Sequence, residues 1–233
     1  MAFRSGLLHT VVVVAAGTVA MACRTGPRSI APVGLAPVAA DSVRRWLEPL
    51  AAAHSMRYDL RWQLRNSKGA ASGRAAVRVA PPDSLRFDYR GAFGKAGAAM
   101  VVGDTGVWAE PEGDFRDILQ SAPLFWAALG LPLPPGPGVP VSALERPEFR
   151  AWRYVVASDT FDFVHVRGPD ERLLAEMRRR GRIVGVTETH FAPGIGRATE
   201  ARIDFPAVET RFSFTVDLVD STGAFAPEIW NRP

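Results

Sequence analysis

The chain has 233 residues, of which 47% are hydrophobic and 22% are charged, and its formal net charge at pH 7 is +4. This composition is typical of one globular domain and excludes a disordered or collagen-like chain. Lysine occurs only at Lys68 and Lys95, so arginine supplies the positive charge. The arginines are spread over many segments and do not form the single stripe that nucleic-acid binding needs, so a general preference for arginine explains them better than an anionic partner does.

The N-terminus has the pattern of a secretory signal peptide over residues 1–22. Arg4 precedes an apolar run at residues 7–21, and small residues follow that run. The run is shorter than the roughly 20 residues that span a bilayer with margin. We therefore expect cleavage of this segment and not a permanent transmembrane helix.

The predicted cleavage site ends at Cys23, the only cysteine of the chain. Small residues before a cysteine resemble the lipobox of bacterial lipoproteins, where the thiol takes a diacylglyceryl group and the cysteine becomes the new N-terminus. Ala20 stands where the lipobox prefers leucine, and Ala20 with Ala22 also suits an ordinary signal peptidase that cuts at the same bond without lipid. An unpaired exposed thiol is a liability in an oxidising compartment, so a sole cysteine at this bond favours lipidation.

Residues 23–40 contain many Pro, Gly and Ala residues without an apolar period. They predict a lipidated cysteine and a flexible tether that leads to a domain at residues 41–233. The domain is expected to begin with a helix that Asp41 or Ser42 caps, with apolar residues at helical spacing up to Leu50.

Residues 56–102 predict four antiparallel strands joined by short turns. Alternation of apolar and polar residues over this length is typical of strands with one buried face. Turn-forming residues at 66–69 and 81–83 separate the first strands. A glycine-rich loop at residues 91–97, with Phe93 at its centre, leads to a fourth, apolar strand at residues 98–102. The expected product is a sheet with one apolar face and one face rich in arginine.

The rest of the chain continues the sheet after one helical insertion. A short strand at residues 106–110 precedes a second helix from about Asp114 with one apolar stripe, and the proline-rich stretch 131–138 must be an extended loop. A helical turn at residues 142–146 is expected next. Six further strands, joined by short turns, begin at Phe149. The total is about eleven strands and two or three helices.

The order of these elements resembles the LolA/LolB superfamily of lipoprotein carriers. The resemblance covers residues 41–230 and includes the closing tail Phe225-Ala226-Pro227-Glu228-Ile229-Trp230. It rests on element order and not on a catalytic signature. It implies an α+β fold in which a strongly curved antiparallel sheet of about eleven strands forms an incomplete barrel covered by two or three helices. A lipidated Cys23 is similar to the LolB branch, since the LolA branch is unlipidated.

The same resemblance implies an apolar cavity for acyl chains between the sheet and its helices. A strongly curved sheet has a concave face that short helices cannot fill at the usual packing density of about 0.74. The alternative is that the same side chains simply form a filled core. The residues expected to line the cavity are Tyr58, Leu60, Trp62, Leu64, Leu85, Phe87, Tyr89, Met100 and Trp126.

The expected function is therefore that of an envelope lipoprotein, lipid-anchored in the outer membrane and facing the periplasm. As a monomer it would bind acyl chains of lipoproteins or lipids, receive them from a periplasmic carrier protein, or insert them into the membrane. In the LolB branch the corresponding loop carries a protruding apolar residue that serves delivery, and Phe93 is similar to it in position. The alternative is a non-catalytic structural or assembly lipoprotein with a filled core and a protein partner.

Sequence motifs for chemistry do not support an enzyme. Residues 91–96 are too short for a phosphate-binding loop, and no Gly-x-Ser-x-Gly elbow is present. The histidines are isolated, so no metal-ligand spacing exists. Glu188 and His190 share one face of a strand, where two polar residues on a solvated surface are the simpler explanation. No cofactor, metal or nucleic acid is expected.

Overall fold

The structure is a computed structural model, and it describes residues 29–91, 94–112, 120–194 and 196–233. Within these residues the chain forms thirteen strands of one sheet, two α-helices and two 3-10 helices. The predicted signal peptide, Cys23 and Phe93 lie outside the described residues. Within the described residues no helix is both long and apolar enough to cross a membrane.

The elements follow one another along the chain mostly as hairpins. Their bounds are β1 Ala36–Val38, α1 Ala40–Leu47, β2 Met56–Asn66, β3 Gly69–Ala80, β4 Ser84–Gly91, β5 Ala96–Val102, β6 Thr105–Glu110, α3 Ala122–Ala128, β7 Val141–Glu145, β8 Phe149–Val156, β9 Asp159–Val166, β10 Arg172–Arg179, β11 Arg182–Phe191, β12 Ala198–Phe205, η2 Pro206–Val208, β13 Thr210–Ser221 and η3 Pro227–Trp230.

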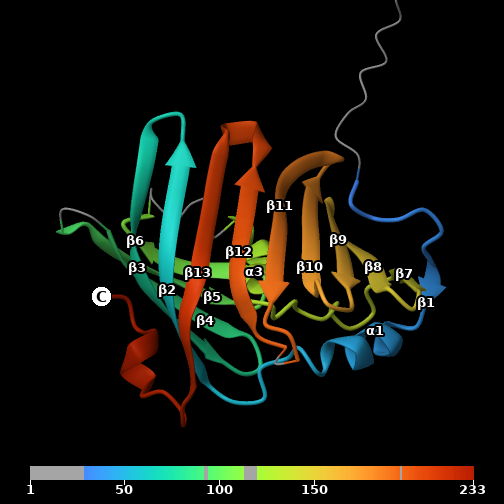
Figure 1. Cartoon of the computed structure of the whole chain (residues 1–233), viewed down its shortest axis with the longest axis horizontal. Helices are drawn as coiled ribbons and strands as arrows, with labels where there is room; N and C mark the ends of the chain where they lie inside the picture. The colour runs from blue at the N-terminus through green and yellow to red at the C-terminus, as the bar shows by residue number, and fades with distance from the viewer. Residues whose placement is uncertain (1–28, 92–93, 113–119, 195) are drawn as a thin grey trace, which may run out of the picture.

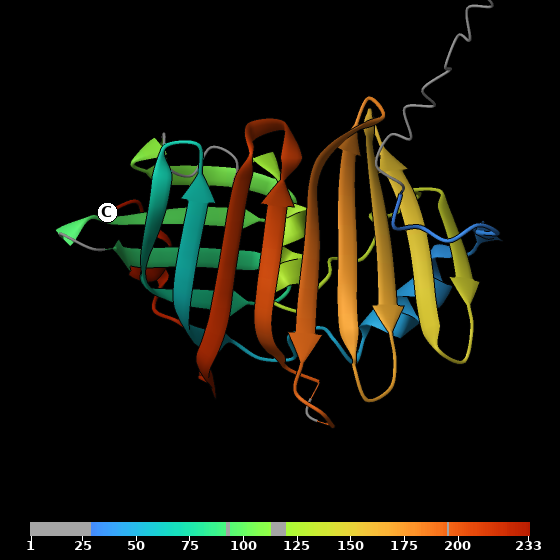
Figure 2. The same cartoon turned by 45° about the horizontal axis from the view of Figure 1, so that its top comes forward.

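The sheet is antiparallel, strongly curved and unclosed. Its strand order is β1-β7-β8-β9-β10-β11-β12-β13-β2-β3-β4-β5-β6, so β1 and β6 form the two edges. The right-handed twist that adjacent strands share accumulates over so many strands. Strands β4, β5 and β6 accordingly run steeply across the direction of β9 and β10 (Figure 2). The predicted fold class, an incomplete antiparallel barrel with few helices, is confirmed.

The eleven predicted strands are all present, as β2 to β6 and β8 to β13, and two more join the sheet. Strand β7 occupies the place where a helical turn was expected, and it pairs with β8. Strand β1 lies inside the expected tether and pairs with β7. Its three residues include Pro37, which is tolerated at a sheet edge but hides a strand pattern from sequence reasoning. The folded body therefore begins before residue 41.

The sheet has an inner face, which carries α3, and an opposite outer face (Figure 1). Strand β2 shows the alternation: Tyr58, Leu60 and Trp62 are buried on the inner face, while Arg57 and Arg61 are exposed on the outer face. Strand pairing keeps the same alternation in register across neighbouring strands. The predicted division into an apolar and an arginine-rich face is thus observed.

The two helices differ from their predicted patterns. Helix α1 buries Val43 and Leu47 as expected, but Asp41 pairs with Arg44 at 2.8 Å and no side chain caps the helix. Helix α3 was expected to have one apolar stripe, whereas all seven of its residues are buried. A helix that is apolar on every side must be surrounded by protein. Helix α3 therefore fills space on the inner face of the sheet.

Candidate functional site

Eight of the nine predicted cavity residues lie on the inner face or in α3. Six of these are buried side chains, and two, Leu64 and Tyr89, are partly buried and pack against them. The six buried ones are Tyr58, Leu60, Trp62, Leu85, Phe87 and Trp126. Sequence alternation therefore assigned the seven strand residues to the inner face, and their role in binding a ligand stays a prediction.

Met100 is the exception among the predicted lining residues. It pairs with Arg86 on β4 and with Trp108 on β6. Because its neighbours Ala99 and Val101 are the buried core positions of β5, Met100 points to the outer face. There the Arg86 guanidinium lies 5.2 Å from the ring centre of Trp108. In an all-apolar strand the inward positions do not show in the sequence, which is why this prediction was wrong.

Six rings next to α3 form an aromatic cluster, which we define as Trp62, Phe87, Tyr89, Phe125, Phe212 and Phe214. The Trp62 and Tyr89 rings meet edge to face at 5.5 Å between centroids, and Phe125 of α3 lies 5.7 Å from Phe212. Phe87 lies 6.2 Å from Phe212. These are favourable aromatic geometries, each worth about 0.5–1.5 kcal/mol beyond area burial. The cluster joins α3 to both β4 and β13.

Three members of the aromatic cluster were not predicted as site residues. Phe212 and Phe214 lie on β13, which pairs directly with β2 and places them opposite Leu64 and Trp62. Their own alternation in the last strand was a usable signal. The pairing of the last strand with β2 was not visible in the sequence, because it joins segments about 150 residues apart. Phe125 was missed because α3 is apolar all round.

Three hydrogen bonds from side chains hold α3 and its surroundings in place. The buried hydroxyls of Thr187 and Thr189 on β11 donate to the carbonyl oxygens of Leu124 and Ala127, at 3.2 and 2.9 Å. The Trp126 indole N–H donates to the carbonyl oxygen of Gly103 at 2.8 Å. Helix α3 is thus fixed by these bonds and by apolar packing.

A glycine on β11 allows α3 to lie close to the sheet. A Cβ atom at Gly185 would lie 2.7 Å from Leu124 Cδ1 and 3.1 Å from Phe205 Cδ1. Such distances are below van der Waals contact, so a side chain at this position would force Leu124 and Phe205 to move. The position therefore favours close packing of α3 against the inner face.

Burial also changes the acidity of two tyrosines on the inner face. It raises the pKa of Tyr58 to about 12, although Arg197 partly opposes this. Burial likewise raises the pKa of the Tyr154 phenol well above its usual value. Both phenols are therefore neutral at physiological pH, and the inner face carries no charge at these positions.

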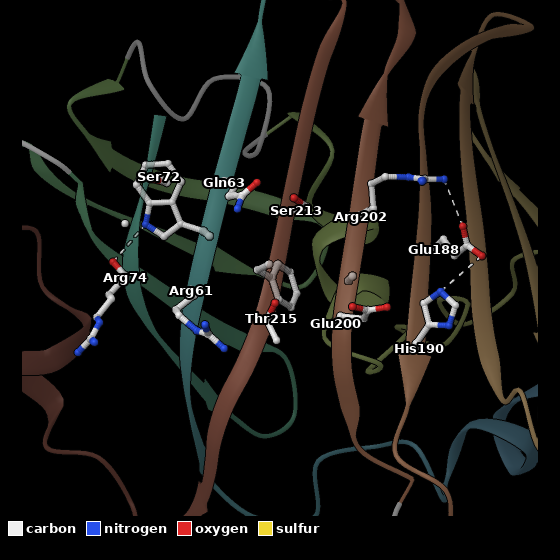
Figure 3. A pocket seen from close by; sticks show the side chains of 14 residues that line it. Arg61, Gln63, Ser72, Arg74, Glu188, His190, Glu200, Arg202, Ser213 and Thr215 are labelled. Atoms are coloured by element: carbon white, nitrogen blue, oxygen red, sulfur yellow. Dashed lines mark hydrogen bonds and ion pairs between the residues drawn. The ribbon is translucent and has the colours of Figure 1, made fainter. Parts of the chain in front are cut away.

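The outer face has a shallow groove of about 590 Å³ across β2, β3, β11, β12 and β13 (Figure 3). Its lining is polar and includes Glu188 and His190, the pair that sequence reasoning considered for acid–base work. Glu188 lies 3.2 Å from Arg202, 3.7 Å from Arg172 and 3.6 Å from His190 Nε2. These contacts form a network of ion pairs on the outer face. Within the described residues no cluster of His, Cys, Asp or Glu could hold a metal ion.

A second outer groove, of about 1180 Å³, lies between β2 to β5 and the C-terminal tail. The tail is attached by backbone acceptors: Arg86 donates to the carbonyl oxygens of Ile229 and Asn231, and the Trp108 indole donates to that of Trp230 at 3.2 Å. The aromatic-proline tail noted in the sequence is therefore a cover for the outer face.

Together these features define an open antiparallel half-barrel with an apolar inner face on which helix α3 lies. No family model matches the chain, and no curated protein matches it in sequence. Among solved structures, the chain is similar to a LolA superfamily protein from Nitrosomonas europaea, with 10% identity and a TM-score of 0.47 over 84% of this chain and 98% of that one.

Two further solved structures are similar to the chain. One is a putative outer membrane lipoprotein-sorting protein domain from Vibrio parahaemolyticus, with 6% identity and a TM-score of 0.49 over 83% of this chain and 97% of that one. The other is from the MucA/MucB complex of Pseudomonas aeruginosa, with 13% identity and a TM-score of 0.35 over 83% of this chain and 60% of that one.

Proposed function

We propose that this chain is an envelope lipoprotein, anchored through Cys23, whose inner face binds acyl chains of lipoproteins or lipids without covalent chemistry. The observation that carries the proposal is helix α3, which is apolar on all sides and occupies the inner face. The strands that pack against it present mainly apolar side chains, together with two threonines on β11. A saturated acyl chain in the place of α3 would contact the same apolar side chains.

Exchange of α3 for an acyl chain is physically reasonable because α3 contributes nothing to the sheet's hydrogen bonding. The ladders of β10, β11 and β12 are complete without it. An acyl chain gains about 0.8 kcal/mol for each methylene group that it buries, so a long chain offsets the apolar contacts that α3 gives up. The hydroxyls of Thr187 and Thr189 then act as latches that favour the docked position of α3.

In this proposal the protein works as a monomer at the outer membrane and faces the periplasm. It receives acylated cargo from a periplasmic carrier protein, or inserts that cargo into the membrane. Phe93, in the loop between β4 and β5, would assist transfer at the membrane surface. The support for these roles is the lipobox-like sequence around Cys23 and the apolar inner face, which together suit a membrane-bound acceptor of acyl chains.

The test uses residues 23–233 with Cys23→Ser, which contain every described residue and lack the anchor. Native mass spectrometry of this protein, purified from bacteria, is expected to show bound lipid. Titration with a fluorescent fatty acid then compares the parent with Thr187→Val and Thr189→Val, which keep side-chain shape but remove the latching hydroxyls. The matched control is Thr199→Val, which removes an exposed hydroxyl bond to the carbonyl oxygen of His190.

Each latch variant is expected to bind the fatty acid about fivefold more tightly, because a hydrogen bond worth about 1 kcal/mol no longer favours the docked helix. The Thr199→Val control should bind like the parent. Two results together would contradict the proposal. The parent would carry no lipid, and the Thr187→Val and Thr189→Val variants would be less stable and bind no fatty acid.

A second candidate is a structural or assembly lipoprotein with a filled core and a protein partner. The observation in its favour is the close packing of α3 against Gly185 and within the aromatic cluster. Under this function, Thr187→Val lowers the melting temperature and has no other effect. The fatty-acid titration therefore separates the two functions.

A further inference from the structure

Four strand connections lie together along one end of the sheet, and we call this end the rim. Strand register places them side by side: Val156 pairs with Asp159, Asp159 with Arg179, and Arg179 with Arg182. Farther along the sheet, Phe205 pairs with Thr210 and Asn66 with Gly69. The connections β2–β3, β10–β11 and β12–β13 are seen along the top of Figure 1.

The rim carries exposed cations without acidic partners. Arg65 and Lys68 flank the β2–β3 turn, and Arg180 and Arg182 flank the β10–β11 turn. All four side chains are exposed, and among the described residues none of them forms an ion pair, whereas most arginines of the outer face do. A surface that keeps four such cations unpaired is suited to anionic groups.

Apolar side chains are exposed at the same place. Val155, Val156 and Val208 are 47%, 38% and 50% exposed, and they lie next to the β8–β9 and β12–β13 connections. They are half of the six large apolar side chains that are clearly exposed in the described part of the chain. Valines interspersed with arginines match the boundary between lipid headgroups and acyl chains.

The opposite end of the sheet differs in charge. Its connections carry Asp83, Asp104 and Asp170 beside Arg167 and Arg197. Acidic and basic groups are mixed there, so that end has no comparable excess of unpaired cations. The two ends of the strands are therefore electrostatically unlike.

The N-terminal segment reaches the body close to the rim. Ser29 lies against Asp162 on the outer face of β9, three residues from the rim residue Asp159, which is about 10 Å along a strand. Ser29 comes six positions after Cys23, and a chain of this length spans at most about 20 Å. Under the proposed lipidation, the anchor can thus lie at the level of the rim.

We infer that the rim is a docking surface for a bilayer whose headgroups are anionic phospholipids. The four cations bind the headgroup phosphates, and Val155, Val156 and Val208 enter the interfacial layer. The inference goes beyond the proposed function, since acyl binding at the inner face does not require it. It also sets an orientation, with the strands pointing toward the membrane and the C-terminal tail on the outer face.

The test measures sedimentation of the Cys23→Ser protein, residues 23–233, with two kinds of vesicles. One kind contains phosphatidylcholine alone, and the other contains phosphatidylglycerol as well. Arg180→Gln combined with Arg182→Gln removes two rim charges. The matched control, Arg45→Gln combined with Arg197→Gln, removes two exposed charges that lie away from the rim.

Binding is expected only with phosphatidylglycerol, and it should fall as salt concentration rises. The rim variant should bind more weakly by roughly tenfold or more, because each cation near an anionic surface contributes about a factor of five. The control should bind like the parent. Equal losses in both variants, or equal binding to both vesicle types, would overturn the inference.

An interface between two copies of the chain is the other use of such a surface. It would appear as a concentration-dependent dimer in analytical ultracentrifugation that the rim variant abolishes, with no difference between rim and control variants on vesicles. That result too would overturn membrane docking.

Discussion

Tyr58 is fully buried on the inner face of β2, and its burial raises the pKa of the phenol to about 12. The unfolded chain releases this proton near pH 10, so between pH 10 and 12 the unfolded state binds fewer protons than the folded state. The stability that Tyr58 contributes is therefore complete below pH 10 and is lost as the pH rises from 10 to 12.

We expect Tyr58→Phe to weaken this pH dependence. Phenylalanine keeps the ring in place and loses only the hydroxyl, whose one contact in the structure is a 3.7 Å approach to the Met56 sulfur. Denaturant unfolding at pH 9 and pH 11.5 measures the difference, which is of the order of 2 kcal/mol for a shift of two pKa units. If the parent and the variant lost the same free energy of unfolding between pH 9 and pH 11.5, this loss could not be assigned to Tyr58.

Phe93 remains a prediction at the residue scale, because it lies outside the described residues. It follows Gly91 at the end of β4, in a loop rich in glycine. We expect Phe93→Glu to change the free energy of unfolding by no more than about 0.5 kcal/mol, as at other surface sites. Transfer of bound lipid to liposomes should become weaker. A large fall in melting temperature, or unchanged transfer, would show that this loop does not face the membrane.

At the scale of elements, the alternation of apolar and polar residues identified the buried face of a strand wherever its other face is exposed to solvent. The arginines of β2, β3 and β4 mark the outer face so clearly that the inner residues could be read directly from the sequence. Alternation could not identify the buried face where no polar residue marks the exposed one. This is the case for Met100 in the apolar strand β5 and for α3, whose residues are all buried.

Short strands that are stabilised mainly by pairing with neighbouring strands could not be predicted from the sequence either. Strand β1 has three residues and β7 has five, too few for a period to appear. Each is stabilised by pairing with the other and, for β7, with β8. The outer grooves were missed for a related reason, since they depend on the pairing of β13 with β2, a contact between distant segments.

The segment before β1 is attached to the sheet through one serine. Asp162 and Glu176 face each other across β9 and β10 and are both almost completely buried. Arg153 donates to Asp162 at 2.6 Å, and Arg178 donates to Glu176 at 2.6 Å. The Ser29 hydroxyl lies 3.3 Å from the first carboxylate and 3.2 Å from the second. Ser29 thus bridges two acids that otherwise repel one another.

We expect Ser29→Ala to lower the free energy of unfolding by about 1 kcal/mol, because two buried carboxylates lose a shared donor. Amide hydrogen exchange of residues 29–35 should become faster, since the segment loses its attachment. The matched control is Ser158→Ala, whose hydroxyl lies 3.3 Å from the exposed side of Asp159. Equal effects of the two substitutions would show that Ser29 does not fix the segment.

At the scale of the whole molecule, the sheet separates two kinds of surface. The inner face is apolar and holds α3, while the outer face and rim carry the arginines. This division lets one chain bind an apolar ligand on one side and an anionic surface at its rim. The proposed anchor at Cys23 joins the body through Ser29, near that rim, so the three features would act on the same membrane.

The anchor itself gives the last prediction. Cys23→Ser in the full chain is expected to leave a protein that is unprocessed or secreted without lipid. If the secreted form retains any membrane association, it comes from the rim cations, so a high-salt wash should release it. The lipidated parent should resist salt and leave membranes only with detergent, because two or more buried acyl chains do not depend on charge. Fractionation after each wash, with mass spectrometry of the N-terminal peptide, measures both outcomes. A parent protein found wholly in the soluble periplasmic extract, with an unmodified Cys23, would contradict the lipid anchor.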